Sequence, residues 1–233
     1  MDPVRPSLQE LVRRVREVPS PEVRLSGLIA SVAIAEQQLE IARHLEPEKL
    51  RQLLSAQPEH TDDQADRVYD LEVQLTHLLP KLFRGGSILA IWSTLEACTK
   101  DLAVYSARIL GKPSPQALFR GSFIAACEKA FSRVSIHAFD SAATRERLAL
   151  LAGVRSAIIH HNSELQALPA GIAKDRAALE EAGLYVESDL HHEYFVPTAE
   201  FVLKSLLAVD QHLRSLAARV RASAPLPPAP SDA

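Results

Sequence analysis

An arginine and two histidines lie close together in the sequence GVRSAIIHHNSEL. Arg155 precedes His160 by five residues, and His161 and Asn162 follow directly. Histidine exchanges protons near neutral pH, because its unperturbed pKa is about 6.5. Arginine keeps its charge and presents a fork of donors that suits phosphate oxygens. Together these side chains fit cleavage of RNA by its own 2′-hydroxyl, which needs a base, an acid and a cation but no metal.

The spacing of these residues raises a geometric question. Five residues along an ideal helix turn a side chain by about 140°, so Arg155 and His160 do not converge on one small target from one straight helix. Three arrangements remain open: separate structural roles, a helix that ends or distorts near His160, or a site completed by a second chain. Ser156 shares a face with His160 and can hydrogen-bond its ring. The structural alternative is that the helix dipole alone favours Arg and His near a C-terminus.

Glu96 is a second candidate for chemistry, in the regularly patterned segment 87–110. It lies beside the apolar stripe of that segment, where a carboxylate can orient an imidazole or pair with Arg155. The alternative is a surface ion pair with Lys100, one helical turn later, which would contribute little.

Metal and cofactor sites have little support in the sequence. His191 and His192 are poor co-ligands, because adjacent side chains diverge in a strand, and no spacing typical of a metal site accompanies them. Cys98 and Cys127 lie within apolar segments, which predicts two reduced, buried thiols. Glycine-rich phosphate loops and paired-carboxylate motifs do not occur. We therefore expect neither a metal nor a cofactor.

Composition predicts a helical protein with a sizeable core. The chain has 233 residues, of which 47% are hydrophobic, and it has 8 glycines. A net charge of −3 argues against a protein that coats nucleic acid through bulk charge, although a local basic site is compatible with it. The start lacks a hydrophobic signal region, and no apolar run reaches the roughly 20 residues that span a membrane. We therefore expect a cytoplasmic protein without a membrane partner.

Apolar residues at steps of three and four predict the helices that position these side chains. The first helix starts near Pro21, and Pro47 opens a shorter one. A third starts at Thr61, where Gln64 completes a capping box, and Pro80 with the glycine pair that follows kinks or ends it. Further helices are predicted over residues 87–110, 115–120, 122–134 and 141–162, and from residue 197 onward.

The remaining segments complete the predicted architecture. Residues 183–196 have the alternation and aromatic content of a short strand pair or an extended loop. The Pro-rich tail, residues 223–233, is expected to be disordered. The pattern predicts an all-α helical bundle, divided into an N-terminal helical extension (1–58), a helical domain (59–222) and the tail.

Two pieces of the sequence resemble the HEPN superfamily. VRSAIIHHNSEL resembles its R-x(4–6)-H motif, and SILAIWSTLEACTKDL resembles the upstream helix that carries an aromatic residue, then Glu, then a Lys-Asp-Leu-like stretch. The segment from LYVES to the last predicted helix also resembles the end of these domains. The resemblance covers about residues 60–220. In one departure, Ser156 stands where active members often have Asn, Asp or His.

The resemblance implies a helical bundle that forms a homodimer, in which the two motif helices face each other and complete one site. It also implies a metal-independent endoribonuclease with RNA as its substrate, of the kind that serves as a toxin or an antiviral defence effector. An antitoxin or a defence-system protein is then a possible partner. By this resemblance Arg155 would bind the scissile phosphate, His160 would transfer protons, and Glu96 would buttress the motif.

Three further residues would support this site by resemblance: Ser156, His161 and Asn162. His161 also falls within the permitted spacing from Arg155. The competing hypothesis is a catalytically silent helical module that binds RNA or a partner protein. The net charge near zero and the lack of a basic RNA-binding surface visible in the sequence favour that alternative.

Overall fold

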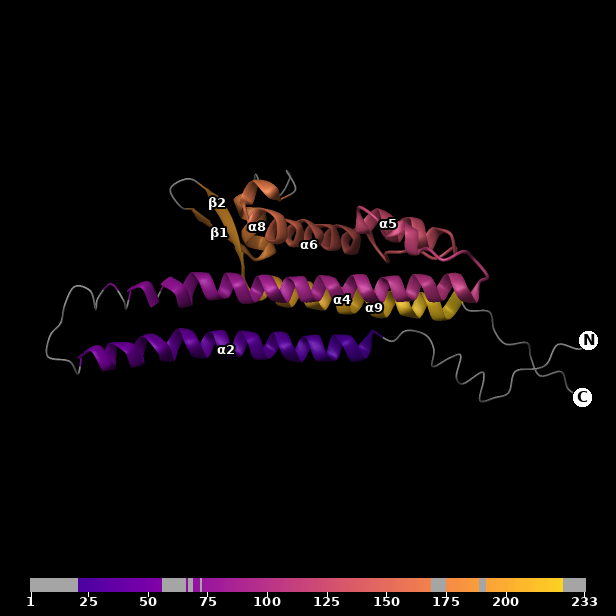
Figure 1. Ribbon diagram of the computed structural model, residues 1–233. Coiled ribbons are helices and arrows are strands. Elements are labelled where there is room, and N and C mark those ends of the chain that lie inside the picture. Colours follow the sequence, from indigo (N-terminus) through magenta and orange to yellow (C-terminus); the bar gives the residue numbers. More distant parts are fainter. Residues whose placement is uncertain are drawn as a thin grey trace, which may run out of the picture. The chain divides into compact units, whose positions relative to one another are not determined.

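The computed structural model describes residues 21–55, 66, 69–71, 73–168, 175–188 and 192–223. Most of these residues are helical, and the strands among them form one two-stranded sheet, so the fold is the predicted all-α helical bundle (Figure 1). Contacts within the chain divide it into two compact units. The first unit contains the described residues of 1–25, 93–149 and 208–233, and the second contains those of 26–92 and 150–207.

Helix α2, Glu22–Ser55, confirms the predicted apolar stripe. Leu25, Val32 and Leu39 are 0%, 7% and 4% exposed and lie seven residues apart, the spacing of a coiled-coil seam. Pro47 does not open a new helix as predicted, because α2 continues through it. A proline removes one N–H donor from a helix, and the hydrogen bonds of the residues on both sides keep this helix continuous.

Helix α4, Leu79–Ile109, follows a π-helical turn at Gln74–Leu78 without a break. The amide of Leu79 donates to the carbonyl of the residue five positions earlier, which is the wide hydrogen-bond ring of a π-helix. This wide turn immediately precedes Pro80, whose ring would crowd the carbonyl of a regular α-helical turn. The prediction was that Pro80 and the glycine pair 85–86 kink or end the helix. It is wrong about the end, since α4 runs through all three residues.

The first unit is built around the predicted stripes of α4 and of the last helix. A 3-10 turn, Gln116–Leu118, and helix α5, Phe123–Ser132, follow α4 at close to the predicted positions. Helix α9, Ala199–Ser223, contributes its C-terminal part. Side chains that are completely or almost completely buried form the core of this unit: Leu95, Leu102, Phe131, Leu148, Val209, Leu213 and Leu216.

The second unit contains the predicted strand pair. Strands β1, Leu184–Ser188, and β2, Glu193–Pro197, pair antiparallel, with Val186 opposite Phe195. They follow the short 3-10 turn Leu165–Ala167 and helix α8, Arg176–Ala182. Gly183 ends α8 with φ of 85°, and a Cβ atom there would lie 3.0 Å from the backbone nitrogen of Phe201, so the tight connection to β1 requires glycine.

Other sequence predictions fall outside the described residues. The capping box of Thr61 and Gln64 lies there, as does the predicted domain boundary at residues 58–59 and all of the tail from residue 224. The division into an N-terminal extension and a helical domain therefore stays a prediction. No helix in the described ranges combines the length and the apolar character that crossing a membrane requires.

Candidate functional site

Helix α6, Ala142–His161, carries the residues of the Arg–His motif. It ends at His161, one residue after His160, so the helix ends near His160, as one of the three arrangements allowed. Arg155 and His160 nevertheless both lie inside the helix. A straight helix separates Arg155 and His160 by about 140°, and they then have either separate roles or a shared site that needs a second chain.

The C-terminal turns of α6 have one buried face and one exposed face. Val154 and Ala157 are fully buried, while Arg155 and Ser156 are partly buried. The last turn is open to solvent at Ile159, which is 43% exposed, and at the three residues that follow it. The rings of the two adjacent histidines, 160 and 161, meet edge to face with centroids 6.4 Å apart.

A left-handed turn anchors this end of α6 to the strand pair. Asn162 and Ser163 have φ of 47° and 65°, a conformation that asparagine tolerates better than most residues. The amide of Ser163 donates to the carbonyl of Ala157 at 3.0 Å, and the carbonyl of Ser163 accepts from the amide of Phe195 in β2 at 2.9 Å. Ser163 is only 3% exposed. The buried turn therefore links the end of α6, with its exposed histidines, to strand β2.

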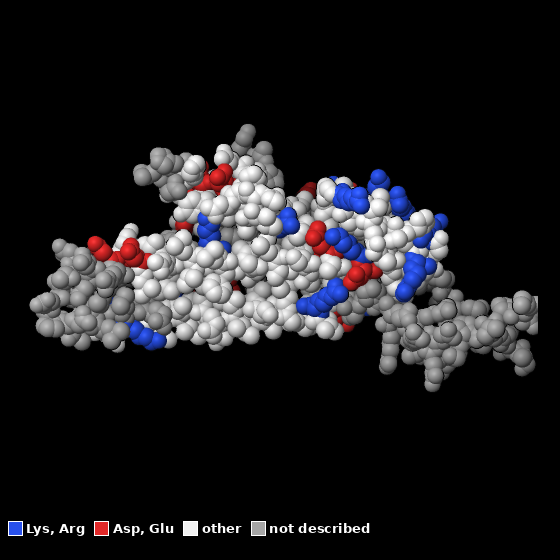
Figure 2. All heavy atoms as spheres, viewed as in Figure 1, with Lys and Arg blue, Asp and Glu red and all other residues white. Residues whose placement is uncertain are grey.

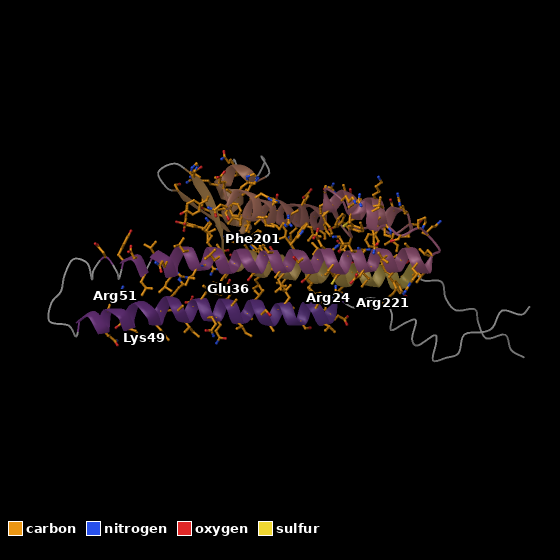
Figure 3. The ribbon with its side chains drawn as sticks, in the orientation of Figure 1. Arg24, Glu36, Lys49, Arg51, Phe201 and Arg221 are labelled. Carbon is orange, nitrogen blue, oxygen red and sulfur yellow. The ribbon has the colours of Figure 1, made fainter. Side chains whose placement is uncertain are left out.

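The guanidinium of Arg155 has no partner among the described residues of its unit. None of them accepts a hydrogen bond from it or forms an ion pair with it, although the residue is partly buried. Arg84 of the same unit provides the contrast, because it binds Glu36 through two nitrogens at 2.9–3.2 Å. Figure 3 shows Glu36 on the side of α2 that faces α4. Partly buried cations are normally paired, so Arg155 is suited to an anionic ligand.

Glu96 lies in the first unit, and the Arg–His motif lies in the second. The charge of Glu96 acts on Cys127, where burial and then the charges of Glu128 and Glu96 raise the pKa of the thiol well above its usual range. The predicted ion pair with Lys100 does not form, because the Lys100 ammonium lies over the ring of Phe119, 5.9 Å from its centroid. The role of Glu96 in the motif stays a prediction.

Lys81 and Tyr194 adjoin the end of the motif helix and were missed by the sequence analysis. Tyr194 forms an isolated β-bridge with Glu164, just after α6, and the ammonium of Lys81 lies 4.4 Å from the centre of its ring. The two residues belong to different helical and strand segments, so no local motif relates them. The ammonium of Lys81 is therefore a second cation, besides Arg155, in the part of the second unit that contains the left-handed turn.

The expectation about the cysteines is confirmed. Cys98 and Cys127 are free thiols and are buried. Among the described residues, no group of three or more His, Cys, Asp and Glu side chains is arranged to hold a metal ion. His192 is described and His191 is not, so the pair of histidines at 191–192 lies partly outside the described residues.

The first unit has a basic surface that the net charge of the chain conceals. Figure 2 shows Lys and Arg side chains gathered over α5. Between residues 112 and 147 the sequence has six Lys or Arg residues and three Asp or Glu residues, in a chain whose net charge is −3. Five of these cations are exposed and have no ion-pair partner among the described residues; we call them the basic face: Lys112, Arg120, Lys129, Arg133 and Arg147.

No family model, curated protein or solved structure matches this chain.

Proposed function

We propose that the protein is a metal-independent endoribonuclease of the HEPN type, acting as a toxin or an antiviral defence effector in the cytoplasm. The observation that carries the proposal is the partly buried guanidinium of Arg155, which the described residues of its unit leave unpaired, on the same helix as an exposed histidine. A cation held without a counter-charge is a ready site for a phosphate. The free, reduced cysteines fit a reducing compartment.

The reaction follows from the chemistry of these side chains. The 2′-hydroxyl oxygen of a ribose attacks the adjacent phosphorus, and the bond from phosphorus to the 5′-oxygen breaks. His160 accepts the proton of the attacking hydroxyl, or returns one to the leaving oxygen, and Arg155 stabilises the charge that develops on the phosphate. One chain supplies one His160, so two copies supply both a base and an acid. Arg155 and His160 of one helix are separated by about 140° and do not converge on one target. In a homodimer whose motif helices face each other, the second copy supplies the groups that one helix cannot.

The surface near the motif suits contact with another protein chain. Ile159, the residue before His160, is 43% exposed. Leu82 of α4 is 70% exposed and precedes Gly85, which lies against Ile158, by one helical turn. Exposed apolar side chains next to polar ones are typical of interaction surfaces. These exposed side chains support a nuclease whose second copy binds at this surface. They equally support the alternative, a silent module that binds a partner protein there.

Wild-type protein is expected to cleave single-stranded RNA in the presence of EDTA. Because the attacking group is the 2′-hydroxyl, the products should end in a 2′,3′-cyclic phosphate and a 5′-hydroxyl. The measurement is gel analysis of an end-labelled RNA, followed by mapping of the product ends. Products with 3′-hydroxyl and 5′-phosphate ends, or complete loss of cleavage in EDTA, would contradict the mechanism. A protein that binds but never cuts, and whose induction leaves growth unchanged, would favour the silent module.

The basic face is proposed to hold the RNA backbone. Exposed large apolar side chains are not found among the described residues of 108–147, so this surface suits a polyphosphate better than an apolar protein partner. Replacing Arg120, Lys129 and Arg133 together by glutamine should weaken RNA binding by about tenfold to hundredfold and reduce the salt dependence of binding. Fluorescence anisotropy with a labelled oligonucleotide measures both effects.

A matched control for the basic face removes the same charge elsewhere. Arg176, Lys204 and Arg214 are exposed but already face the carboxylates of Glu193, Glu200 and Asp210. Their triple replacement by glutamine should change affinity much less. Equal loss in the two triple variants would show that only total charge matters and that the basic face is not a binding site.

A further inference from the structure

Helix α2 has a second apolar stripe that lies opposite its buried one. Ile34 follows the buried Val32 by two residues, which turns it by about 200° to the outer side of the helix. Ile34, Ile41 and Leu45 are 58%, 41% and 50% exposed. Gly27 and Ala30 are small, exposed residues on the same side. We call these five residues the outward stripe of α2: Gly27, Ala30, Ile34, Ile41 and Leu45.

From residue 25 to residue 35 the outward side of α2 lacks the charges that a solvated helix face normally has. The sequence has no charged residue at all over this range. The next, Glu36, is tied to Arg84 of α4. The hydroxyl of Ser31 is also satisfied within the helix, since it donates to the carbonyl of Gly27 at 2.9 Å. About three turns of exposed helix are thus uncharged and apolar, which is the surface of an interface rather than of a solvated helix.

Gly27 independently points to a close neighbour on this side. Glycine inside a helix is less stabilising than alanine, because it loses more backbone freedom on folding. The fold of a single chain does not require it, because Gly27 has ordinary helical geometry and a Cβ atom there would have no described atom within 4 Å beyond the adjoining backbone of α2. A glycine that a single chain does not need is explained by another backbone that approaches at this point.

The order of small and large residues identifies the neighbour. The small residues Gly27 and Ala30 precede Ile34, and the large residues Ile41 and Leu45 follow it. When a second copy of α2 runs antiparallel with Ile34 near the twofold axis, Ile41 of one helix lies over Gly27 of the other, and Leu45 lies over Val23, which is 81% exposed. A parallel copy would set Gly27 against Gly27 and leave a gap there.

Charge also favours the antiparallel direction. Glu48 continues the seven-residue series of 27, 34 and 41, so a parallel pair would bring two Glu48 carboxylates together. RNA is excluded as the occupant, because the outer side has no Lys or Arg between residues 25 and 42. A membrane surface is excluded by the same absence, since interfacial helices have a basic rim.

We propose that two copies of this chain associate through the outward stripes of α2, paired antiparallel so that Ile41 of one copy covers Gly27 of the other. This contact is separate from the one proposed at the Arg–His motif and does not rest on the proposed function. Because a twofold contact repeats each pair, one interface contains two such Ile41–Gly27 contacts.

Disulfide formation between two single-cysteine variants tests the direction. Gly27→Cys and Ile41→Cys chains, each with a different tag, are mixed in the full-length protein and oxidised; the natural thiols at positions 98 and 127 are buried. The antiparallel pair predicts that the mixed disulfide between the two variants forms at least tenfold faster than either identical pair. Faster formation of the identical pairs, or no cross-link that exceeds that of the wild-type chain, would overturn the proposal.

A substitution that preserves the single chain tests the association itself. Gly27→Leu has open space in the monomer and improves helix propensity, so the variant should unfold at the same or a higher temperature. It should weaken one association step at least tenfold by sedimentation, whatever the starting assembly. Ala125→Leu is the control, because Ala125 is also exposed and helical but lies in α5, outside both proposed contacts between copies. Equal association of both variants would overturn the proposal.

A comparison of the full chain with a chain lacking residues 1–20 tests whether that segment covers the outward stripe instead. A full chain that stays monomeric while the shortened chain associates would overturn the proposal, since residues 1–20 would then be the occupant.

Discussion

The Arg155→Ala variant is expected to cleave RNA about 10²–10³-fold more slowly than the wild type, because removal of one preorganised donor to a developing oxyanion typically costs this much. The loss should appear in kcat/KM with a fluorogenic RNA in EDTA. The variant should keep its thermal stability, since the guanidinium of Arg155 has no partner among the described residues of its unit to lose. Arg155→Lys keeps the charge but loses the two-pronged geometry, and so it should recover only part of the rate.

The control for this prediction removes an arginine outside the motif, and two histidine variants separate the roles of His160 and His161. Arg43→Ala removes an exposed arginine from α2 and should leave the rate unchanged. His160→Ala should slow cleavage by about 10²–10⁴, the usual contribution of a general acid or base. His161→Ala should have a small effect, because it is the neighbour that supports the site. If Arg155→Ala matches the wild type, or if His161→Ala alone abolishes cleavage, the assignment of roles is wrong.

The second large effect is expected on stability in acid, and it arises at His212. This side chain of α9 is 1% exposed, stacks on Phe139 with centroids 5.4 Å apart, and has no hydrogen-bond partner for either ring nitrogen in the part of the chain that is described. Burial and then the positive charge of Arg219 lower the pKa of His212 to about 4, while Asp140 opposes the shift. The folded protein therefore holds a neutral imidazole at pH values where the unfolded chain is protonated.

The sign of the effect follows from proton binding. Above about pH 6.5 His212 is neutral in both states and contributes no pH dependence. Between pH 6.5 and about 4 the unfolded chain binds a proton that the folded protein does not, so stability falls as the pH falls. The loss attributable to His212 should reach about 3 kcal/mol, a large share of the roughly 5–15 kcal/mol that stabilises a typical domain.

Urea unfolding at pH 7.5 and pH 4.5 measures this loss. The His212→Leu variant should keep its stability at pH 7.5, because the substitution also removes two buried nitrogens without partners. Between the two pH values it should lose about 2–3 kcal/mol less stability than the wild type. His137→Leu, at an exposed histidine of the same unit, is the matched control and should retain the wild-type dependence. Equal pH dependence in the His212 variant and the wild type would contradict the prediction.

Periodicity in the sequence predicted the packing faces of the helices well. The stripes that include Leu39, Leu102 and Leu213 are buried at the spacing expected for helices that pack on a core. Prolines were misread, because local rules treat Pro47 and Pro80 as helix boundaries. In the structure the helix continues at both prolines. Helix α2 runs through Pro47 without a break, and a π-helical turn precedes Pro80.

The candidate site was predictable in its residue types but not in its surroundings. The sequence predicted a chemistry for Arg155 and His160, which stays a prediction, and both residues lie on one helix, as the periodicity indicated. It gave no sign that Arg155 has no partner among the described residues of its unit while Arg84 binds Glu36, because pairing depends on which helices meet. The left-handed turn at Ser163 was equally hidden, since its tie to β2 joins residues 32 positions apart.

The path of the chain between the two units bears on how such a protein can evolve. The chain passes from one unit to the other within α2, α4, α6 and α9, after residues 25, 92, 149 and 207. Exchange of either unit with another gene would therefore require four recombination breakpoints, each inside a helix. The two units are therefore expected to be inherited as one piece.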